Sequence, residues 1–222
     1  MFDEVEFTHL RQAVADLLPD SCNVLNIVAT NNAGRYTHSY GTIYQDIACR
    51  FDGTEDTYKV SLTYGTPVTS DNLLQYNNGL YSIVTVNADA SWAIVSRLDA
   101  KKIINTDECI LQVYSGTVNA YGEILPIWTD GATYACQLDT TSQFGTTPGA
   151  ENLRTDMITV TWDASVRLPI TATADVRDRI KVTKRDGVNV TPLIYGIVSP
   201  DNLLSDGHHF RLKRVEPSFE SV

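Results

Sequence analysis

The residues best suited to chemistry in this chain are its four cysteines, which form two pairs of equal spacing. Cys22 and Cys49 are 27 positions apart (49 − 22), and so are Cys109 and Cys136 (136 − 109). A zinc site would need ligands placed close together, and neither pair supplies a C-x-x-C motif. We therefore interpret the cysteines as buried thiols of a protein from a reducing compartment, with one disulfide in each pair as the alternative.

The four histidines do not indicate a catalytic centre. His38 and Cys49 could be imagined as a nucleophilic pair, but nothing in their spacing requires it. His208 and His209 are adjacent, so on a strand they would point to opposite faces and could not easily share a metal ion. The nucleotide-binding, zinc-protease and serine-hydrolase motifs are also missing from the sequence. We expect no enzyme activity, no metal and no cofactor.

A basic stretch near the C-terminus is the best candidate for a contact surface. Basic and apolar residues alternate over 208–214, as in a strand with one positive face and one core face. The simplest interpretation is a solvent-exposed strand face. The functional interpretation is an inter-subunit contact with an acidic neighbour, plausibly another copy of this chain. Its basic residues are His209, Arg211, Lys213 and Arg214.

The chain as a whole is acidic, with a formal net charge of −10 and a pI near 4.7. This charge argues against a free-standing nucleic-acid binder, which normally carries a basic footprint. The acidic N-terminus is not followed by the apolar core of a signal peptide, and no run of 18 apolar residues is present. We therefore expect folding in the cytoplasm and no membrane partner.

The cysteine pairs also mark an internal repeat with an offset of 87 positions (109 − 22). Aligned without gaps, residues 20–52 and 107–139 are identical at 9 of 33 positions, where random matching would give only a few. The first copy contributes Asp20, Cys22, Thr30, Asn32, Ala33, Thr42, Ala48, Cys49 and Asp52 to these identities. An internal repeat of this kind indicates a repeated structural unit, so the sequence predicts one β unit that is present twice.

A short helix precedes the first copy, and strands follow it. Over residues 3–18, apolar residues recur at helical steps, and Pro19 ends the segment. The apolar members are Phe7, Leu10, Val14 and Leu17. The rest of the chain shows short strand-like runs separated by Gly, Asn, Asp and Pro. We predict an all-β protein of two tandem small antiparallel β-barrel or sandwich units with a short N-terminal α-helix. The divisions are 1–19 for the helix, 20–103 for the first unit and 104–222 for the second.

Local signals predict particular turns and strands within these units. Asn77-Asn78-Gly79 predicts a hairpin, because Asn and Gly tolerate positive φ. Turns are also expected at Gly122 and at Asp186-Gly187. A strand over 92–95 would close the first unit, with Lys101-Lys102 at the junction.

The two copies differ most in the segment 140–156, which we predict to be a long loop. Long loops without structure of their own tend to be functional or disordered. A flexible surface loop is the simpler interpretation, and an aromatic residue within a polar stretch favours contact with a partner. The candidate channel or docking residues are Gln143, Phe144, Thr147, Pro148 and Glu151.

Several segments resemble the head-closure proteins of tailed bacteriophages, also called head–tail joining or stopper proteins. Those proteins commonly begin with a Leu-Pro-Asp-x-Cys-like strand, as Leu18-Pro19-Asp20-Ser21-Cys22 does here, and continue with a strand similar to Ala48-Cys49-Arg50-Phe51. Their later Asp-Arg-Ile, Gly and Tyr-x-Val elements are similar to three further segments. These are Asp178-Arg179-Ile180, the stretch 78–84, and Tyr195-Gly196-Ile197-Val198.

The resemblance implies a structural protein of the virion neck that folds in the cytoplasm of the bacterial host. It implies a ring, usually of six copies, between the portal and adaptor proteins and the tail or tail-terminator protein, with a loop that can close the DNA channel. By position, 140–156 would be the channel or docking loop and 209–214 the inter-subunit contact. Family members usually contain one unit, so this chain would be a tandem duplication. Viral DNA would pass through without sequence-specific binding, because an acidic lumen repels phosphates.

Two other interpretations remain open at this point. The chain could be a tail-completion protein or another tail-associated structural β protein, which only its location in the particle would distinguish. It could also be a cytoplasmic two-domain β module that binds a small ligand or carbohydrate at the tyrosine-rich stretch 36–44. A concave pocket with convergent polar groups would support the second alternative.

Overall fold

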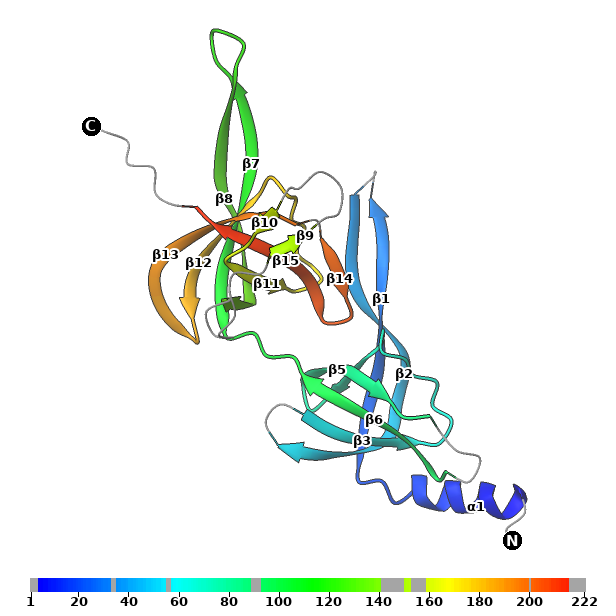
Figure 1. Ribbon diagram of the computed structural model, residues 1–222. Coiled ribbons are helices and arrows are strands. Elements are labelled where there is room, and N and C mark those ends of the chain that lie inside the picture. Colours follow the sequence, from blue (N-terminus) through cyan, green and yellow to red (C-terminus); the bar gives the residue numbers. More distant parts are fainter. Residues whose placement is uncertain are drawn as a thin grey trace. The chain divides into compact units, whose positions relative to one another are not determined.

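The computed structural model describes residues 4–32, 35–54, 57–88, 93–140, 150–152, 159–199 and 201–215. The chain divides into two compact units, residues 1–103 and 104–222 (Figure 1). Each unit is built on its own antiparallel sheet, and the helix α1 (Glu4–Ala15) is the one helix of the described residues. The all-β fold class predicted from the sequence, with two β units and a short N-terminal helix, is confirmed.

The first unit is a closed barrel that we call barrel 1. Its strand order is β1-β2-β3-β6-β5-β4, with every neighbouring pair antiparallel. The strands are β1 (Asp20–Asn32), β2 (Arg35–Thr54), β3 (Thr57–Thr63), β4 (Leu73–Tyr76), β5 (Gly79–Val86) and β6 (Val95–Lys102). Alternate side chains of these strands fill the interior, as expected of a small barrel. The largest fully buried ones are Val24, Val60, Leu62, Leu73, Leu74 and Leu98.

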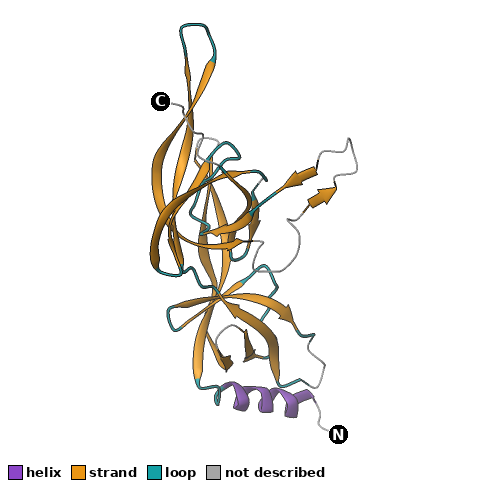
Figure 2. Ribbon diagram, turned by 60° about the vertical axis from the view of Figure 1, so that its left-hand side comes forward, coloured by secondary structure: helices purple, strands orange, loops and turns teal. Residues whose placement is uncertain are grey.

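The helix α1 lies at one end of barrel 1 (Figure 2). Arg11 fixes it there, because its guanidinium lies 3.6 Å from the ring centre of Tyr64 and its Nε donates a 2.9 Å hydrogen bond to the carbonyl of Ala93. The helix is shorter than the predicted segment 3–18. Leu17 was expected on its apolar face but lies beyond its end and is 79% exposed.

The second unit, barrel 2, has the sheet order β11-β8-β7-β12-β13-β15-β14, and an additional pairing between β11 and β15 closes its ring. Its strands are β7 (Asp107–Val118), β8 (Ile124–Thr140), β11 (Ala164–Leu168), β12 (Arg179–Arg185), β13 (Val188–Ile197), β14 (Asn202–Leu204) and β15 (Gly207–Arg214). The short strands β9 (Ala150–Asn152) and β10 (Thr159–Thr161) pair separately with each other.

The two barrels have the same strand order, and equivalent residues pair around the ring of each barrel, which extends the sequence repeat to all the barrel strands. Asp20 pairs with Cys49 in barrel 1, and the residues 87 positions later, Asp107 and Cys136, pair in barrel 2. Five further pairs correspond around the ring, and most of their members are buried. In barrel 1 these pairs are Val24–Leu74, Leu74–Tyr81, Ile83–Ala100, Val60–Leu98 and Phe51–Val60. Their equivalents in barrel 2, in the same order, are Leu111–Ile180, Ile180–Tyr195, Ile197–Leu212, Val166–Phe210 and Leu138–Val166.

The equivalence reaches individual hydrogen bonds. Asn72 and Asp178 are buried two residues before the corresponding Leu74 and Ile180. The side-chain oxygen of Asn72 accepts a 2.9 Å bond from the N–H three residues earlier, and that of Asp178 accepts one of 2.8 Å from the same relative position. One turn geometry is therefore used by both units with different side chains.

The predicted hairpin turns are confirmed by the backbone. Asn77 and Asn78 have φ of 45° and 60° between β4 and β5, and Asp186 and Gly187 have φ of 49° and 76° between β12 and β13. Two consecutive residues with positive φ are the signature of the hairpin turns that match strand twist. Gly122, with φ of 82°, lies in the turn between β7 and β8.

Two predicted segments need correction. The closing strand of barrel 1 was expected over 92–95, but β6 starts at Val95 and includes Lys101 and Lys102, which were taken as a junction. Its inward residues include the small Ser96 and Ala100, which weaken the apolar signal. The segment 140–156 was expected to be a single loop, but Thr140 ends β8 and residues 150–152 form β9.

Candidate functional site

Each barrel extends one hairpin beyond the strands that pair with it (Figure 1). In barrel 1, β4 pairs with β1 only at residues 23–25 and β3 pairs with β2 only at 49–54. In barrel 2, β12 pairs with β7 over 108–112 and β11 pairs with β8 over 137–140. Farther out, the strands of each hairpin pair only with each other among the described residues. We call residues 26–43 arm 1 and residues 113–129 arm 2.

Arm 1 has a mixed surface with little charge, on which Val28, Tyr36 and Ile43 are exposed beside polar residues. Residues 26–43 contain no Asp or Glu, and Arg35 is their one Lys or Arg. Cross-strand pairs such as Thr30–Thr37 and Val28–Ser39 place hydroxyl groups along one face.

Arm 2 has an apolar and almost uncharged surface, with Glu123 as the one charged residue among residues 113–129. Val118 pairs with Ile124 and Gly116 with Pro126, so these four residues lie on one face near the tip. Val118 and Ile124 are 69% and 66% exposed, and Tyr121 in the turn is 91% exposed. Full burial of a side chain of this size contributes about 1.5–3 kcal/mol, so leaving them in water is unfavourable.

The root of arm 2 is held firmly by the segment before β12. The N–H of Tyr114 donates a 2.8 Å bond to Asp178, and Nε1 of Trp128 donates a 2.9 Å bond to the carbonyl of Arg177. The guanidinium of Arg179 lies 3.3 Å from the ring centre of Trp128, and that of Arg177 lies 5.3 Å from Tyr114. Tyr114 and Trp128 are a cross-strand pair on the same face as Val118 and Ile124. This face therefore has an apolar tip and a root with charges of both signs, since Lys181 lies 2.7 Å from Asp130 and Arg177 lies 3.6 Å from Asp175.

The cysteines are buried inside the barrels and do not form an exposed reactive site. All four are free thiols, and the thiols of Cys22 and Cys49, like those of Cys109 and Cys136, are close enough to hydrogen-bond. The hydrogen bond with Cys22 and burial raise the pKa of Cys49, and the hydrogen bond with Cys109 and burial do the same for Cys136. The predicted burial of the thiols is confirmed.

The basic strand is β15, and its alternation is confirmed. Phe210 and Leu212 are buried, whereas Lys213 and Arg214 are exposed. Other members find partners within barrel 2: His209 contacts Asp206 at 2.8 Å, and the guanidinium of Arg211 lies 4.3 Å from the ring centre of Trp162. These contacts tie His209 and Arg211 to side chains of barrel 2, whereas Lys213 and Arg214 lie on its exposed surface.

Other predicted residues are not brought together. His38 is paired with Ala29 in arm 1, while Cys49 lies in the barrel 11 residues farther along β2 (49 − 38). At the rise of an extended strand this separates them by roughly 35 Å, so they cannot act as a pair. His208 is buried, with its ring nitrogens 2.6 Å from Asp201 and 3.0 Å from the carbonyl of Ile170, and it points away from His209. Within the described ranges, no three acidic, histidine or cysteine side chains are grouped as a metal site would need.

The candidate loop 140–156 lies mostly outside the described residues. Gln143, Phe144, Thr147 and Pro148 lie outside the described residues. Glu151 lies in β9, where it pairs with Val160 of β10. No helix of the described ranges has the length and apolar character to cross a membrane.

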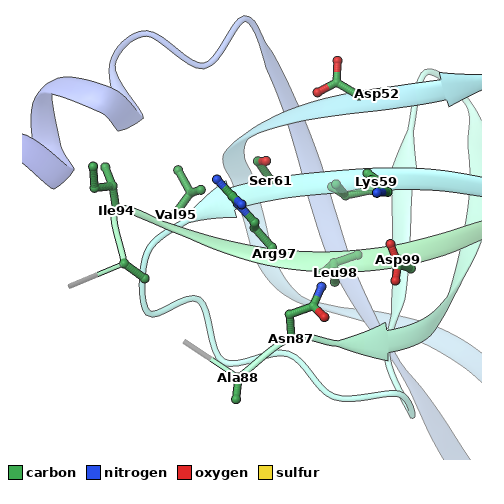
Figure 3. A pocket seen from close by; sticks show the side chains of 12 residues that line it. Asp52, Lys59, Ser61, Asn87, Ala88, Ile94, Val95, Arg97, Leu98 and Asp99 are labelled. Carbon is green, nitrogen blue, oxygen red and sulfur yellow. The ribbon is translucent and has the colours of Figure 1, made fainter. Parts of the chain in front are cut away.

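A cavity of about 770 Å³ lies on barrel 1 beside β3 and β6 (Figure 3). Lys59 is the cross-strand neighbour of both Asp52 and Asp99, and Ser61 is the neighbour of Arg97. Figure 3 shows Lys59 on the strand between the two carboxylates. The lining has alternating charges, which suits a polar ligand, and it does not include the tyrosine-rich stretch 36–44.

Comparison with known proteins adds no relative to these observations. Neither the scan against protein-family models nor the searches of curated proteins and solved structures gave a match.

The exposed apolar face of arm 2 is the feature that sequence reasoning missed. A signal for it was present, because the run from Val113 to Thr129 has one charged residue in a chain that is 20% charged. The two copies differ in length at 140–156, whereas this hairpin aligns with arm 1 without a gap, so the repeat did not single it out.

Proposed function

We propose that this chain is a structural, non-enzymatic protein of the virion neck of a tailed bacteriophage. It would assemble as a ring, with six copies as the resemblance implies, between the portal and adaptor proteins and the tail or tail-terminator protein. Viral DNA would pass through the ring, and the chain would not bind its sequence.

The observation that carries this proposal is the pair of arms. Each barrel has a complete core of its own, yet one hairpin of each barrel extends beyond it. Among the described residues of that barrel, no third strand pairs with the extended part. An isolated two-stranded hairpin is marginally stable in water, and exposed strand edges favour pairing with other chains. Such arms are expected of a subunit whose surface is completed by its neighbours.

The positions of the family-like segments support the same proposal. Leu18-Pro19-Asp20-Ser21-Cys22 leads into β1, and Ala48-Cys49-Arg50-Phe51 lies on β2. Tyr81 of β5 and Tyr195 of β13 occupy equivalent buried positions in the two barrels. The resemblance therefore falls on residues that build the repeated unit, as it would in a duplicated family member.

The charge of the chain also fits this role. With 27 acidic against 17 basic residues, a ring of these subunits would repel the phosphates of DNA that passes through it. Packaged DNA would then slide along the channel, because few phosphate contacts would hold it.

Negative-stain electron microscopy of the full chain mixed with the portal–adaptor assembly and tails of its phage would test the proposal. We expect rings at the portal or tail end. A chain that binds neither assembly and never forms a ring would contradict it. Localisation to the distal tail would favour the tail-associated alternative.

The cavity on barrel 1 favours a second candidate, a β module that binds a small polar ligand. Its volume of about 770 Å³ lies within the range of ligand sites, and the polar groups of Lys59, Ser61 and Arg97 line it. Isothermal titration calorimetry with a panel of sugars and polar metabolites, on the chain and on a Lys59→Ala variant, separates this candidate. Saturable heat that the variant abolishes would favour it over the neck protein.

A further inference from the structure

A histidine is buried at the point where the pairing of β11 with β15 closes the ring of barrel 2. His208 is the cross-strand partner of Leu168 in β11 and of Leu203 in β14. It is 4% exposed, and its ring is nearly parallel to that of Phe210, with 6.4 Å between the ring centres. Because the side chain is withdrawn from water, its two ring nitrogens depend on protein groups for their hydrogen bonds.

Both ring nitrogens of His208 face oxygen atoms that accept hydrogen bonds. Nδ1 lies 2.6 Å from a carboxylate oxygen of Asp201, and Nε2 lies 3.0 Å from the carbonyl oxygen of Ile170. A neutral imidazole has one N–H donor, so beside an ionised carboxylate it satisfies one of these oxygens and turns a lone pair toward the other. Both contacts are hydrogen bonds only when the Asp201–His208 pair holds one further proton, on the ring or on the carboxyl group.

The charged groups around this pair divide between the two faces of β15. Asp201 faces His208, and its side chain is 36% exposed, so the pair can exchange a proton with water. Neither the segment 169–172 nor β14 contains a charged residue. On the other face, Asp206 contacts His209 at 2.8 Å and Arg167 at 3.2 Å, because successive residues of a strand point to opposite faces.

Barrel 1 holds the equivalent junction without a titratable group. Ser96 pairs with Leu62 at the position where His208 pairs with Leu168, and it is also buried. Its hydroxyl accepts a 3.1 Å hydrogen bond from the N–H of Gly65, which follows β3 as Ile170 follows β11. Both barrels therefore tie the closing strand to the segment after its partner strand, but only barrel 2 does so with a histidine and a carboxylate.

We propose that Asp201 and His208 form a pH-sensitive contact that stabilises the closure of barrel 2. At neutral pH the pair holds one shared proton, and its two hydrogen bonds join the segments before β14 and after β11 to β15. Loss of the proton leaves a buried nitrogen facing an oxygen without a hydrogen bond, which is unfavourable.

The direction of the pH dependence follows from this proton. The folded chain holds it more tightly than the unfolded chain, in which a histidine titrates near about pH 6.5. The contribution to stability is therefore fully present below about pH 6.5 and is lost at the higher pH at which the folded pair gives up its proton. This inference concerns barrel 2 alone and goes beyond the proposed neck function.

Long-range ¹H–¹⁵N NMR of the ¹⁵N-labelled full chain at about pH 7 tests the protonation directly. We expect two ring N–H signals from one histidine, both of which are absent from the spectrum of His208→Gln. Asp206→Asn, on the other face of β15, is the matched control and should keep both signals. A His208 ring with one N–H in the wild type, beside an ionised Asp201, would overturn the inference.

Urea denaturation of the wild type and His208→Gln between about pH 6 and about pH 9 tests the consequence for stability. The wild type should have the higher urea midpoint at the acidic end, and the difference should shrink as the pH rises. Asp201→Asn keeps an acceptor oxygen but loses the charge, so its own loss of stability should begin at a lower pH than that of the wild type. A difference between the wild type and His208→Gln that stays constant with pH would contradict the proposal. If His208→Gln does not fold, the wild-type NMR spectrum and Asp201→Asn still decide the question.

Discussion

Asp178 accepts a 2.8 Å hydrogen bond from the backbone N–H of Tyr114 and thereby ties the turn before β12 to the root of arm 2. Its second oxygen accepts a 2.8 Å bond from the N–H of Asp175, within the same turn. Asn72 makes the corresponding turn bond in barrel 1 with an uncharged amide. The two barrels therefore share the same turn, although an amide stabilises it in barrel 1 and a carboxylate in barrel 2.

Replacement of Asp178 should therefore reveal what the carboxylate contributes. Asp178→Ala removes the acceptor for two backbone N–H groups in a buried site, which should lower the free energy of unfolding by about 2–4 kcal/mol. Asp178→Asn keeps one acceptor oxygen, as Asn72 does, and should cost less than Asp178→Ala. Urea denaturation followed by circular dichroism measures both. An alanine variant as stable as the wild type would contradict the role assigned to this residue.

The stacking of Arg179 on Trp128 should limit the opening of arm 2. Trp128→Leu removes the ring under the guanidinium and the hydrogen bond to Arg177, which together should lower the local opening free energy by about 1–2 kcal/mol. Hydrogen–deuterium exchange should then become faster over residues 113–129. Tyr121→Leu, at the exposed turn, is the control and should leave exchange at the root unchanged. Equal protection in Trp128→Leu and the wild type would show that the stacking does not hold the arm.

The four thiols should be unreactive while the chain is folded. Burial and the hydrogen bonds within each pair raise the pKa of Cys49 and Cys136, so the reactive thiolate form is disfavoured. A chromogenic disulfide reagent should label no cysteine in native buffer and all four in denaturing guanidinium. Fewer than four thiols in the denatured, unreduced chain would indicate a disulfide instead. Rapid labelling of the native protein would contradict the burial.

The network around Asp206 should make barrel 2 sensitive to acid. Burial alone would raise the pKa of Asp206, but hydrogen bonds and charges from His209 and Arg167 outweigh it and hold the pKa below the usual carboxyl value. The folded-state pKa is therefore below the unfolded one, so the carboxylate stabilises the fold at neutral pH. This contribution is lost as the pH falls through the folded-state pKa, below about pH 4.

Urea denaturation across this pH range measures the effect. Asp206→Asn should be less stable than the wild type at neutral pH, and the difference should shrink as the pH falls through the folded-state pKa. Asp71→Asn, at an exposed turn, serves as the control and should give no comparable change. A difference that is constant with pH would mean that the ionised carboxylate is not the stabilising form.

The sequence predicted the repeat well where the two copies align without gaps. Asp20 and Cys49 identify the register of β1 and β2, and Asp107 and Cys136 identify that of β7 and β8. Beyond Asp139 the offset changes from 87 to 106, as the equivalence of Val60 and Val166 shows (166 − 60), because barrel 2 contains the extra segment before β11. A gapless comparison therefore could not reveal that all the barrel strands are repeated.

The exposed apolar residues of arm 2 were harder to predict, because patterns of apolar residues in a sequence mainly indicate buried positions. Ile124 and Val118 resemble core residues in type, and only the extent of β7 and β8 beyond their neighbours shows that they are exposed. The basic strand was recognised correctly as a strand. Its partners Asp206 and Trp162 come from other segments, and no spacing in the sequence indicates them.

Native mass spectrometry of the full chain, sprayed from a volatile buffer over a range of concentrations, tests the central claim most directly. A subunit whose arms are completed by its neighbours should form a closed oligomer of one defined copy number, six if the family resemblance extends to stoichiometry. A single species with the 24.6 kDa mass of the monomer at every concentration would contradict the account.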